Sequence, residues 1–317
     1  MSSHKRPHPD LDPASTLPKR PRTAAGPLWT PTSTHVAQHY NARPEVGREK
    51  RKQSPIYSLK NFNNWVKSVL ISKYVRRGDR VLDMCCGKGG DLQKWRNAGI
   101  AEVLGVDIAD VSVDQARQRF REGNFRFKAE YHAADCFTER LADQIVPPDT
   151  LFDLVSIQFA LHYSFESEEK ARRALENITA NLRPGGHLIA TVPNCYWLVK
   201  KLRHDGLVFG NSILTVKFDS EKASRYGHKY NFELKDAIDD CPEYVFHFPT
   251  FEKLAAEYGL KLLYKKPFHQ LYREESEIDA HLQLMQRMNV VNDEGTVSAD
   301  EWEVTGLYVA CAFEKVE

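Results

Sequence analysis

Residues 81–90 read Val-Leu-Asp-Met-Cys-Cys-Gly-Lys-Gly-Gly. The first four residues form an apolar run with one acid, which predicts a short buried strand, and the glycines after it predict a tight loop. A helix is expected to begin at Asp91. A strand, a glycine loop and a helix in this order are typical of the first crossover of an α/β sheet.

The same alternation continues along the chain. Before residue 81, apolar residues recur at intervals of three and four between Phe62 and Tyr74, which predicts an amphipathic helix ending near Gly78. After the loop we predict strands at 103–106, 131–134, 152–159 and 188–192, a helix opened by the pair Ser112 and Gln115, a helix over 167–181, and a turn at 184–186. Strands that alternate with helices predict a mostly parallel sheet covered by helices on both faces.

Polar residues are predicted at the carboxyl ends of these strands, where ligands bind in open α/β sheets. They are Asp83, Gly87 in the first loop, Asp107, Asp135 and Gln158. A dinucleotide site prefers Gly-x-Gly-x-x-Gly, but Cys85 occupies the first glycine position here. An acid before the loop suits a cationic cofactor without phosphate, such as the one bound by class I methyltransferases, whose first motif this loop resembles. Asp107 is then placed to bind a ribose diol, and Asp135 to accept from an adenine amino group.

Composition sets outer limits on the class of protein. The 317 residues are 42% hydrophobic and 27% charged, which is typical of an intracellular globular protein with one or two domains. No run approaches the ~20 apolar residues of a membrane-spanning helix. The six cysteines show no Cys-x-x-Cys pair, so we expect reduced thiols and no metal site.

Residues 1–53 differ from the rest of the chain. They hold ten Lys or Arg against four Asp or Glu, and eight of the 16 prolines, with little apolar periodicity. Such a segment buries too little surface to offset its ordering entropy, so we predict a disordered basic tail over 1–53 and a folded domain over 54–317. Basic clusters at residues 4–7 and 18–22 suit nuclear import signals or RNA-binding arms, or a tail that only aids solubility.

Several blocks resemble the mRNA cap guanine-N7 methyltransferase family. The most specific are Phe-Asn-Asn-Trp-Val-Lys-Ser at 62–68, Lys-Gly-Gly-Asp at 88–91 and His-Tyr-Ser-Phe-Glu at 162–166, and the resemblance extends over about 55–317. It implies a class I, Rossmann-like fold with a mostly parallel seven-stranded sheet. It also implies S-adenosylmethionine as cofactor and methyl transfer to guanine N7 of the GpppN cap of mRNA.

The resemblance also assigns roles to individual residues. With the strand-end residues above, the cofactor site would comprise Lys67, Asp83, Cys85, Gly87, Asp107, Asp135, Gln158 and Tyr163. The cap site would comprise Asn63, Asn64, Lys88, Lys94, Arg119, His162, Pro193, Glu243 and Tyr308. A capped end presents a base, a ribose and a triphosphate, which suit a carboxylate, aromatic rings and cations respectively. Without the resemblance, the cap-site cations Lys88, Lys94 and Arg119, and also Tyr308 and His162, would be interpreted as ordinary surface or core residues.

The implied reaction requires little acid–base chemistry, because guanine N7 carries a free lone pair and loses no proton. We therefore expect no general base, nucleophile or metal, and assign positioning and electrostatic roles to His162, Tyr163 and Glu243. One departure from the family pattern is Cys85, where glycine is usual. A side chain there costs about 1 kcal/mol if the backbone is left-handed.

Three other interpretations remain open: a class I methyltransferase acting on another RNA, a small molecule or a protein; a non-catalytic cap-binding module; and a nicotinamide-dependent dehydrogenase. The expected partner is capped mRNA, with RNA guanylyltransferase or transcribing RNA polymerase II as further candidates. We expect a monomer located in the nucleus and no contact with a membrane.

Overall fold

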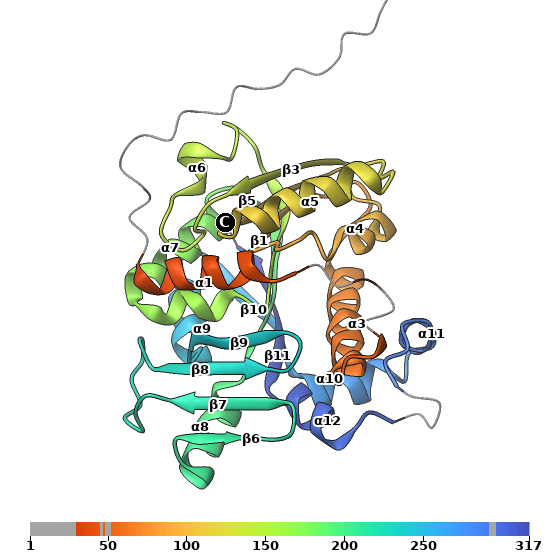
Figure 1. The fold of residues 1–317 in the computed structure, drawn as a ribbon. Coiled ribbons are helices and arrows are strands. Elements are labelled where there is room, and N and C mark those ends of the chain that lie inside the picture. Colours follow the sequence, from red (N-terminus) through yellow and green to blue (C-terminus); the bar gives the residue numbers. More distant parts are fainter. Residues whose placement is uncertain (1–29, 45–46, 48–51, 292–295, 317) are drawn as a thin grey trace, which may run out of the picture.

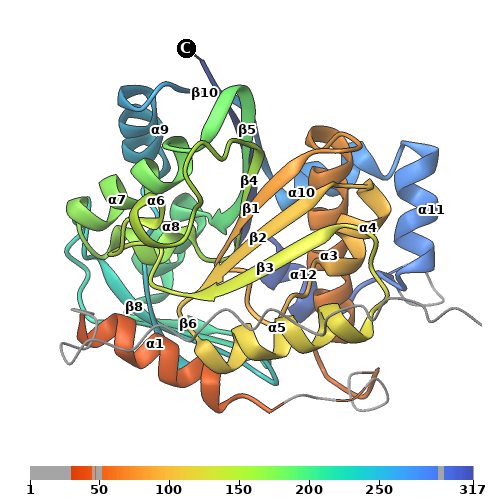
Figure 2. The ribbon, with the colours of Figure 1, turned by 90° about the horizontal axis from the view of Figure 1, so that it is seen from above.

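The structure is a computed structural model that describes residues 30–44, 47, 52–291 and 296–316. Its main sheet has seven strands in the order β10-β11-β5-β4-β1-β2-β3 (Figures 1 and 2). The strands are β1 (Arg80–Met84), β2 (Glu102–Asp107), β3 (Lys128–Ala133), β4 (Phe152–Gln158), β5 (Leu182–Pro193), β10 (Leu260–Pro267) and β11 (Tyr308–Lys315). Strands β1 to β5 pair in parallel, and β10 and β11 are antiparallel to their neighbours. The predicted α/β fold with a mostly parallel sheet of seven strands is confirmed.

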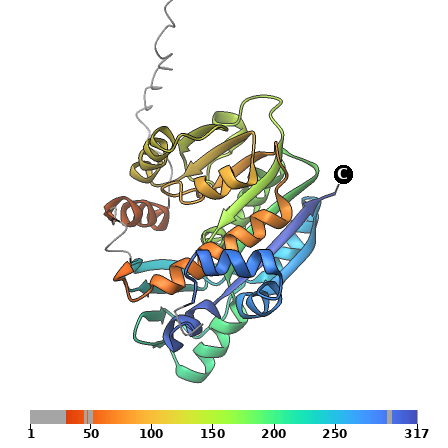
Figure 3. The same cartoon turned by 90° about the vertical axis from the view of Figure 1, so that its right-hand side faces the viewer.

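Helices cover both sides of this sheet (Figure 2). They include α3 (Tyr57–Tyr74), α4 (Leu92–Ala98), α5 (Asp110–Glu122), α6 (Leu141–Gln144), α7 (Glu168–Thr179) and α9 (Phe248–Glu257), with the short 3-10 helix η1 (Leu161–Glu166) after β4. Helix α3 packs against α10 (Phe268–Glu275), α11 (Asp279–Arg287) and α12 (Ala299–Thr305) (Figure 3). No helix in the described part of the chain is long and apolar enough to cross a membrane.

A second sheet follows β5 and was not predicted. After helix α8 (Cys195–Asp205), the strands β6 (Val208–Gly210), β7 (Leu214–Phe218), β8 (Lys229–Leu234) and β9 (Ile238–Tyr244) form an antiparallel sheet in sequence order. Its last strand, β9, contacts η1, which comes from the end of β4 in the main sheet. This contact brings β9 to the edge of the main sheet at which ligands are expected.

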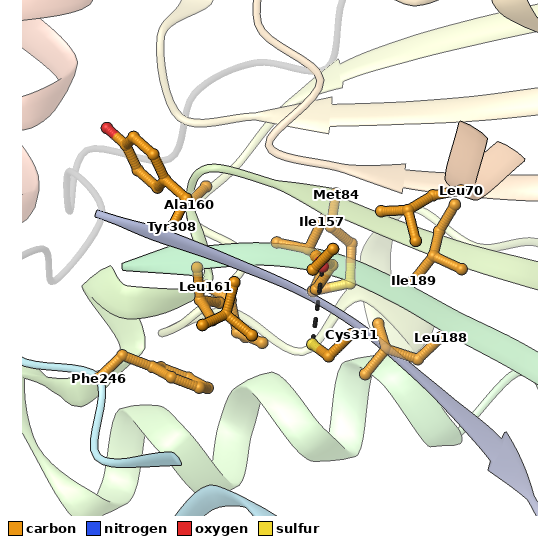
Figure 4. Packing of buried hydrophobic residues seen from close by; sticks show 14 of the residues in the cluster. Leu70, Met84, Ile157, Ala160, Leu161, Leu188, Ile189, Phe246, Tyr308 and Cys311 are labelled. Atoms are coloured by element: carbon orange, nitrogen blue, oxygen red, sulfur yellow. Dashed lines mark hydrogen bonds between the residues drawn. The ribbon is translucent and has the colours of Figure 1, made fainter. Parts of the chain in front are cut away.

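The core is built on the central strands of the main sheet. Met84, Ile157, Leu188 and Ile189 are fully buried and lie together with Leu70 of α3 in Figure 4. The same figure shows the hydrogen bond that the Cys311 thiol donates to the backbone oxygen of Ala190, at 3.6 Å. These strands hold the loops at their carboxyl ends in a fixed arrangement.

The predicted boundary of the tail at residue 53 is wrong for one segment. Residues 31–42 form helix α1 (Pro31–Ala42), which buries Ser33, Val36 and Ala37 and contacts β9 and α5. Thr30 caps the helix by accepting from the backbone N–H of Ser33 at 3.1 Å, and Pro31 occupies the first turn. A threonine cap followed by proline is itself a helix-start signal, which the proline-rich composition obscured. The predicted disorder of 1–29 lies outside the described residues.

Several predicted boundaries also shift. Helix α5 begins at Asp110 rather than at a Ser112 cap, and Ser112 is buried inside it. Strand β5 begins at Leu182 and contains the predicted turn at 184–186, and β3 covers 128–133 rather than 131–134. Strand β4 ends at Gln158, and α3 ends at Tyr74 before Gly78. Strand β3 is an edge strand whose first residues are partly exposed, so pairing with β2 rather than hydrophobicity defines its start.

Candidate functional site

A cavity of about 350 Å³ lies at the carboxyl ends of β1, β2 and β4. This volume falls within the range of roughly 300–1,000 Å³ that is typical of small-molecule sites. Six of the eight predicted cofactor residues line it: Cys85, Gly87, Asp107, Asp135, Gln158 and Tyr163. Parallel strands end at one edge of a sheet, which is why these residues meet although they are far apart in sequence.

Two backbone N–H groups orient the Asp107 carboxylate. Gly87 donates to Oδ2 at 2.8 Å and Ala109 donates to Oδ1 at 2.9 Å. Burial raises the pKa of Asp107, and these two hydrogen bonds partly oppose the increase. The glycine loop after β1 is thereby tied to the end of β2.

Asp135 is held by a segment remote in sequence. Its Oδ1 accepts from the backbone N–H of Phe137 at 2.9 Å, and its Oδ2 accepts from the Ser33 hydroxyl at 2.8 Å. Lys170 in turn donates to Ser33 Oγ at 2.7 Å and to Glu166 Oε2 at 2.6 Å. Ser33 and Lys170 also line the cavity, so helix α1 forms one of its walls.

Cys85 has the left-handed backbone angle expected for the glycine that it replaces, with φ at +60°. The neighbouring Cys136 thiol, together with burial, raises the pKa of Cys85 well above its usual range. Both thiols line the cavity, and all six cysteines are free. Cys85 is therefore an unreactive thiol in a mildly strained position.

The end of β4 contributes a polar and an aromatic wall. The Gln158 side-chain oxygen accepts from the Thr191 hydroxyl at 3.1 Å, which fixes the amide against β5. Phe159 follows with a φ of +58°, and its ring meets that of Tyr308 edge to face at 5.0 Å. Strain of this kind persists where the surrounding packing holds it, and it is common at functional sites.

Lys67 and Asp83 do not line the cavity. Lys67 forms an ion pair with Asp91 at 2.7 Å, and Lys94 forms a second one with Asp91 at 2.7 Å. Burial and then the charge of Asp91 raise the pKa of Asp83 to about 8, although Lys67 opposes the shift. Burial opposes ionisation of Asp91 itself, but Lys67 and Lys94 lower its pKa below its usual range. Asn64 joins this charged cluster by accepting from Lys94 at 2.8 Å.

Glu243 is the centre of a second buried polar group. It is 5% exposed and accepts from the Tyr230 hydroxyl at 2.7 Å and from the Tyr163 hydroxyl at 3.5 Å. His162 Nε2 lies 3.3 Å from Glu243 Oε2, and the rings of His162 and Tyr163 are 4.4 Å apart. Because Tyr163 also lines the cavity, this carboxylate adjoins it.

The remaining predicted cap residues lie around these groups. Arg119 donates to the backbone oxygen of Lys88 at 3.0 Å, and Lys88 lines the cavity. Tyr308 pairs with Pro193 in the ladder between β11 and β5, and both are buried. The side-chain oxygen of Asn63 is buried and has no hydrogen-bond partner among the described residues, and Asn63 does not line the cavity.

Comparison with known proteins decides the family. The model of the mRNA (guanine-N(7))-methyltransferase domain matches residues 30–316. The chain belongs to the mRNA cap guanine-N7 methyltransferase family. It is 45% identical over 305 residues to the mRNA cap guanine-N(7) methyltransferase of Cryptococcus neoformans, covering 92% of this chain and 49% of that protein. It is also 45% identical over 293 residues to the Schizosaccharomyces pombe protein of the same name, covering 88% and 81%.

The chain therefore spans about half the length of the Cryptococcus relative and about four fifths of the S. pombe one. Among solved structures, the CcbJ methyltransferase from Streptomyces caelestis is similar with a TM-score of 0.52 at 13% identity, covering 90% of this chain and 98% of that one. At this identity the likeness concerns the fold alone. It agrees with the class I methyltransferase fold expected for the family.

Within this family member, sequence reasoning missed several residues of the cavity and of the polar group around Glu243. Ser33 and Tyr40 come from α1, and Tyr230 of β8 lies directly across the ladder from Glu243. Lys170 and Glu166 were likewise not predicted. The Thr30–Pro31 start signal could have identified α1, but no local pattern relates the polar residues of β8 and β9 to those of η1.

Proposed function

We propose that this chain transfers the methyl group of S-adenosylmethionine to N7 of the guanine cap of mRNA. The observation that carries the proposal is the buried Glu243 carboxylate, held by Tyr230 and Tyr163 beside a cavity with two further anchored carboxylates. A carboxylate at that place suits the N1 and N2 hydrogens of guanine. Membership of the cap methyltransferase family supports the same substrate.

The residues of the cavity suit the proposed cofactor. Asp107, fixed by Gly87 and Ala109, suits the two ribose hydroxyls, and Asp135 suits the adenine amino group. Outside the lining of the cavity, the ion pair of Lys67 and Asp91 suits the amino acid end, which carries both a carboxylate and an ammonium group, and Asp83 lies beside this pair. When bound, the cofactor supplies an electrophilic methyl group on a sulfonium.

The catalytic contribution of the chain is positioning and electrostatics. Guanine N7 needs no deprotonation, so no general base is required. Glu243 orients the base through its N1 and N2 edge, and its negative charge favours the positive charge that the purine acquires. Tyr163 donates to this carboxylate and forms the wall between it and the cavity, and the His162 ring packs beside both of them.

The triphosphate would lie along the cations at the first loop. Lys88 and Arg119 belong to adjoining segments, because Arg119 reaches the backbone of Lys88. Lys88 donates to the backbone oxygen of Arg43 at 2.7 Å and lines the cavity. Lys94 does not line the cavity and is engaged with Asp91 and Asn64, and burial followed by repulsion from Lys67 lowers its pKa. We assign the phosphates to Lys88 and the adjoining Arg119, and assign Lys94 to holding Asp91.

Location and partners are further parts of the proposal. The basic clusters at 4–7 and 18–22 support a nuclear protein, and a product at the 5′ end of mRNA supports contact with RNA guanylyltransferase or transcribing RNA polymerase II. We propose that the chain acts as a monomer, because the cavity is complete within one chain.

One experiment tests the reaction. The protein is incubated with methyl-labelled S-adenosylmethionine and GpppN-capped RNA, the RNA is digested, and the labelled nucleoside is identified. We expect label in 7-methylguanosine, with none transferred to m7GpppN-capped or uncapped RNA. Label at another atom, or transfer to uncapped RNA, would contradict the proposal. If no transfer occurs, calorimetry with S-adenosylmethionine distinguishes a cap-binding module from a protein that binds neither ligand.

A further inference from the structure

A second hollow, of about 480 Å³, lies near the opposite edge of the sheet and shares no residue with the cavity. Three arginines line it: Arg77 before β1, Arg96 in the last turn of α4 and Arg126 before β3. These positions adjoin the amino ends of three neighbouring parallel strands, so the fold brings together cations that are up to 49 positions apart in sequence.

The charge of this hollow is not neutralised. No Asp or Glu is among its lining residues, and none of the three guanidinium groups has an ion pair or hydrogen bond with another residue in the described part of the chain. All three arginines are exposed. Besides Arg126, the adjoining segment 117–128 holds four Lys or Arg and one Glu, and of these Arg117 is paired with Asp114 at 2.7 Å. Such a surface favours a ligand with several negative charges.

A series of contacts joins the hollow to the cavity. Lys88 of the cavity wall accepts from Arg119 at 3.0 Å, and the next residue, Phe120, stacks on Phe125 with ring centroids 5.7 Å apart. Arg96 of the hollow lies over the Phe125 ring at 5.9 Å. Phe120 and Phe125 are only partly buried, so cations and aromatic faces follow each other along this surface.

We propose that the nucleotides after the cap run from Lys88 over this surface, and that Arg77, Arg96 and Arg126 bind phosphates of the RNA backbone. Single-stranded RNA is bound in this manner, by cations that follow the backbone and aromatic rings that stack on bases. Helix α4 is roughly 10 Å long, so a few nucleotides reach from one site to the other. The inference rests on the proposed function, since it takes capped RNA as the substrate.

The test compares two triple variants of the full chain. Arg77→Ala, Arg96→Ala and Arg126→Ala together remove the hollow's charge. Arg203→Ala, Arg273→Ala and Arg287→Ala remove the same charge from exposed positions on α8, α10 and α11. Each is assayed with the GpppG dinucleotide and with a GpppG-capped 20-nucleotide RNA, and RNA binding is measured across salt concentrations. Thermal melts check that both variants are folded.

For the hollow variant we expect the KM for capped RNA to rise about tenfold or more with kcat unchanged. Three lost phosphate contacts should make the slope of log K against log salt shallower by about 2, at ~0.7 per contact for single strands. The hollow variant should methylate the dinucleotide at the same rate as the original chain. The control variant should change neither the KM for capped RNA nor the salt slope.

Equal KM values for capped RNA in the original chain and the hollow variant would overturn the inference, and so would an equal loss on the dinucleotide. A similar rise in the KM for capped RNA in the control variant would also overturn the inference, because the net charge of the protein, and not the position of the arginines, would then explain the rise. A multiply phosphorylated peptide serves as a competing ligand. If the hollow variant loses affinity for this peptide but keeps its affinity for RNA, the hollow binds a protein and the inference is wrong. Failure of the original chain on both substrates would instead contradict the proposed function.

Discussion

The Ser33 hydroxyl donates a hydrogen bond to Asp135 Oδ2 at 2.8 Å, across 102 positions of sequence. Ser33 is buried, and Lys170 donates to the same hydroxyl oxygen at 2.7 Å. The hydroxyl therefore connects a buried ammonium group to the carboxylate assigned to the adenine amino group. Helix α1 acts on the cofactor site through this connection.

Removing the Ser33 hydroxyl should weaken cofactor binding by disturbing the contact between Asp135 and the adenine amino group. We expect Ser33→Ala to lower the affinity for S-adenosylmethionine several-fold, since a hydrogen bond to a charged group contributes about 1.5–3 kcal/mol and only part of that reaches the ligand. The affinity for an analogue with purine in place of adenine should change little. Ser33→Thr, which keeps the hydroxyl, serves as the control. Equal losses for both ligands, measured by calorimetry, would show that Ser33 only holds α1.

Replacing Cys85 should stabilise the protein. Its φ of +60° costs about 1 kcal/mol for a residue with a side chain, and glycine adopts this angle freely. We expect Cys85→Gly to raise the free energy of unfolding by up to about 1 kcal/mol and to retain cofactor binding. Cys85→Ala, which keeps the Cβ atom but loses the thiol, separates backbone strain from the contact with Cys136. Loss of binding in a folded Cys85→Gly protein would make the thiol a required contact.

Neutralising Glu243 should slow the chemical step. Glu243→Gln keeps the shape of the side chain but removes the charge and converts one accepting oxygen into a donor. A charge-assisted hydrogen bond of about 1.5–3 kcal/mol corresponds to a fall in kcat of roughly ten- to a hundredfold. The assay is single-turnover methylation of capped RNA at saturating substrate. An unchanged kcat with a raised KM would show that Glu243 binds the substrate and the transition state equally well and does not lower the barrier.

Asp83 should make stability depend on pH. Its pKa of about 8 in the folded protein lies above the ordinary value of 3.8 for an aspartate, so between these values the folded state holds a proton that the unfolded state has lost. Its contribution is fully present below about pH 4 and is lost as the pH rises through about 8, at up to about 1.4 kcal/mol per pH unit. We expect Asp83→Asn to remove this decline, as measured by urea unfolding from pH 5 to 8.5. If the free energy of unfolding declines equally with pH in both proteins, the raised pKa of Asp83 is not the cause of the decline.

Two truncations should separate α1 from the residues before it. Deleting 1–29 should leave methylation of the GpppG dinucleotide nearly unchanged and should reduce nuclear accumulation and binding of long RNA. Deleting 1–44 also removes Ser33 and Tyr40, so affinity for S-adenosylmethionine should fall at least as far as in Ser33→Ala. Equal cofactor affinity in the two truncated proteins, each checked for folding, would exclude α1 from the site.

The resemblance and the local patterns predicted different parts of the site. Alternation of strands and helices placed Asp107, Asp135 and Gln158 at one edge, because strand ends in a parallel sheet converge there. The roles of Glu243 and His162 came only from the resemblance, and the structure brings these two within 3.3 Å. Lys67 and Asp83 were expected in the cofactor cavity, yet they lie in the adjoining cluster with Asp91.

The sequence by itself determined the class of fold, the glycine loop at 85–90 and the strand-end acids, since these depend on patterns within a few residues of one another. Only the tertiary structure decided that α1 closes the cavity, that Tyr230 holds Glu243, and that Arg77, Arg96 and Arg126 surround one hollow. Each of these arrangements joins residues on different elements, and their contacts follow from how whole elements pair and pack. Local propensity and periodicity carry no information about that packing, which is why the sequence pattern left these residues unassigned.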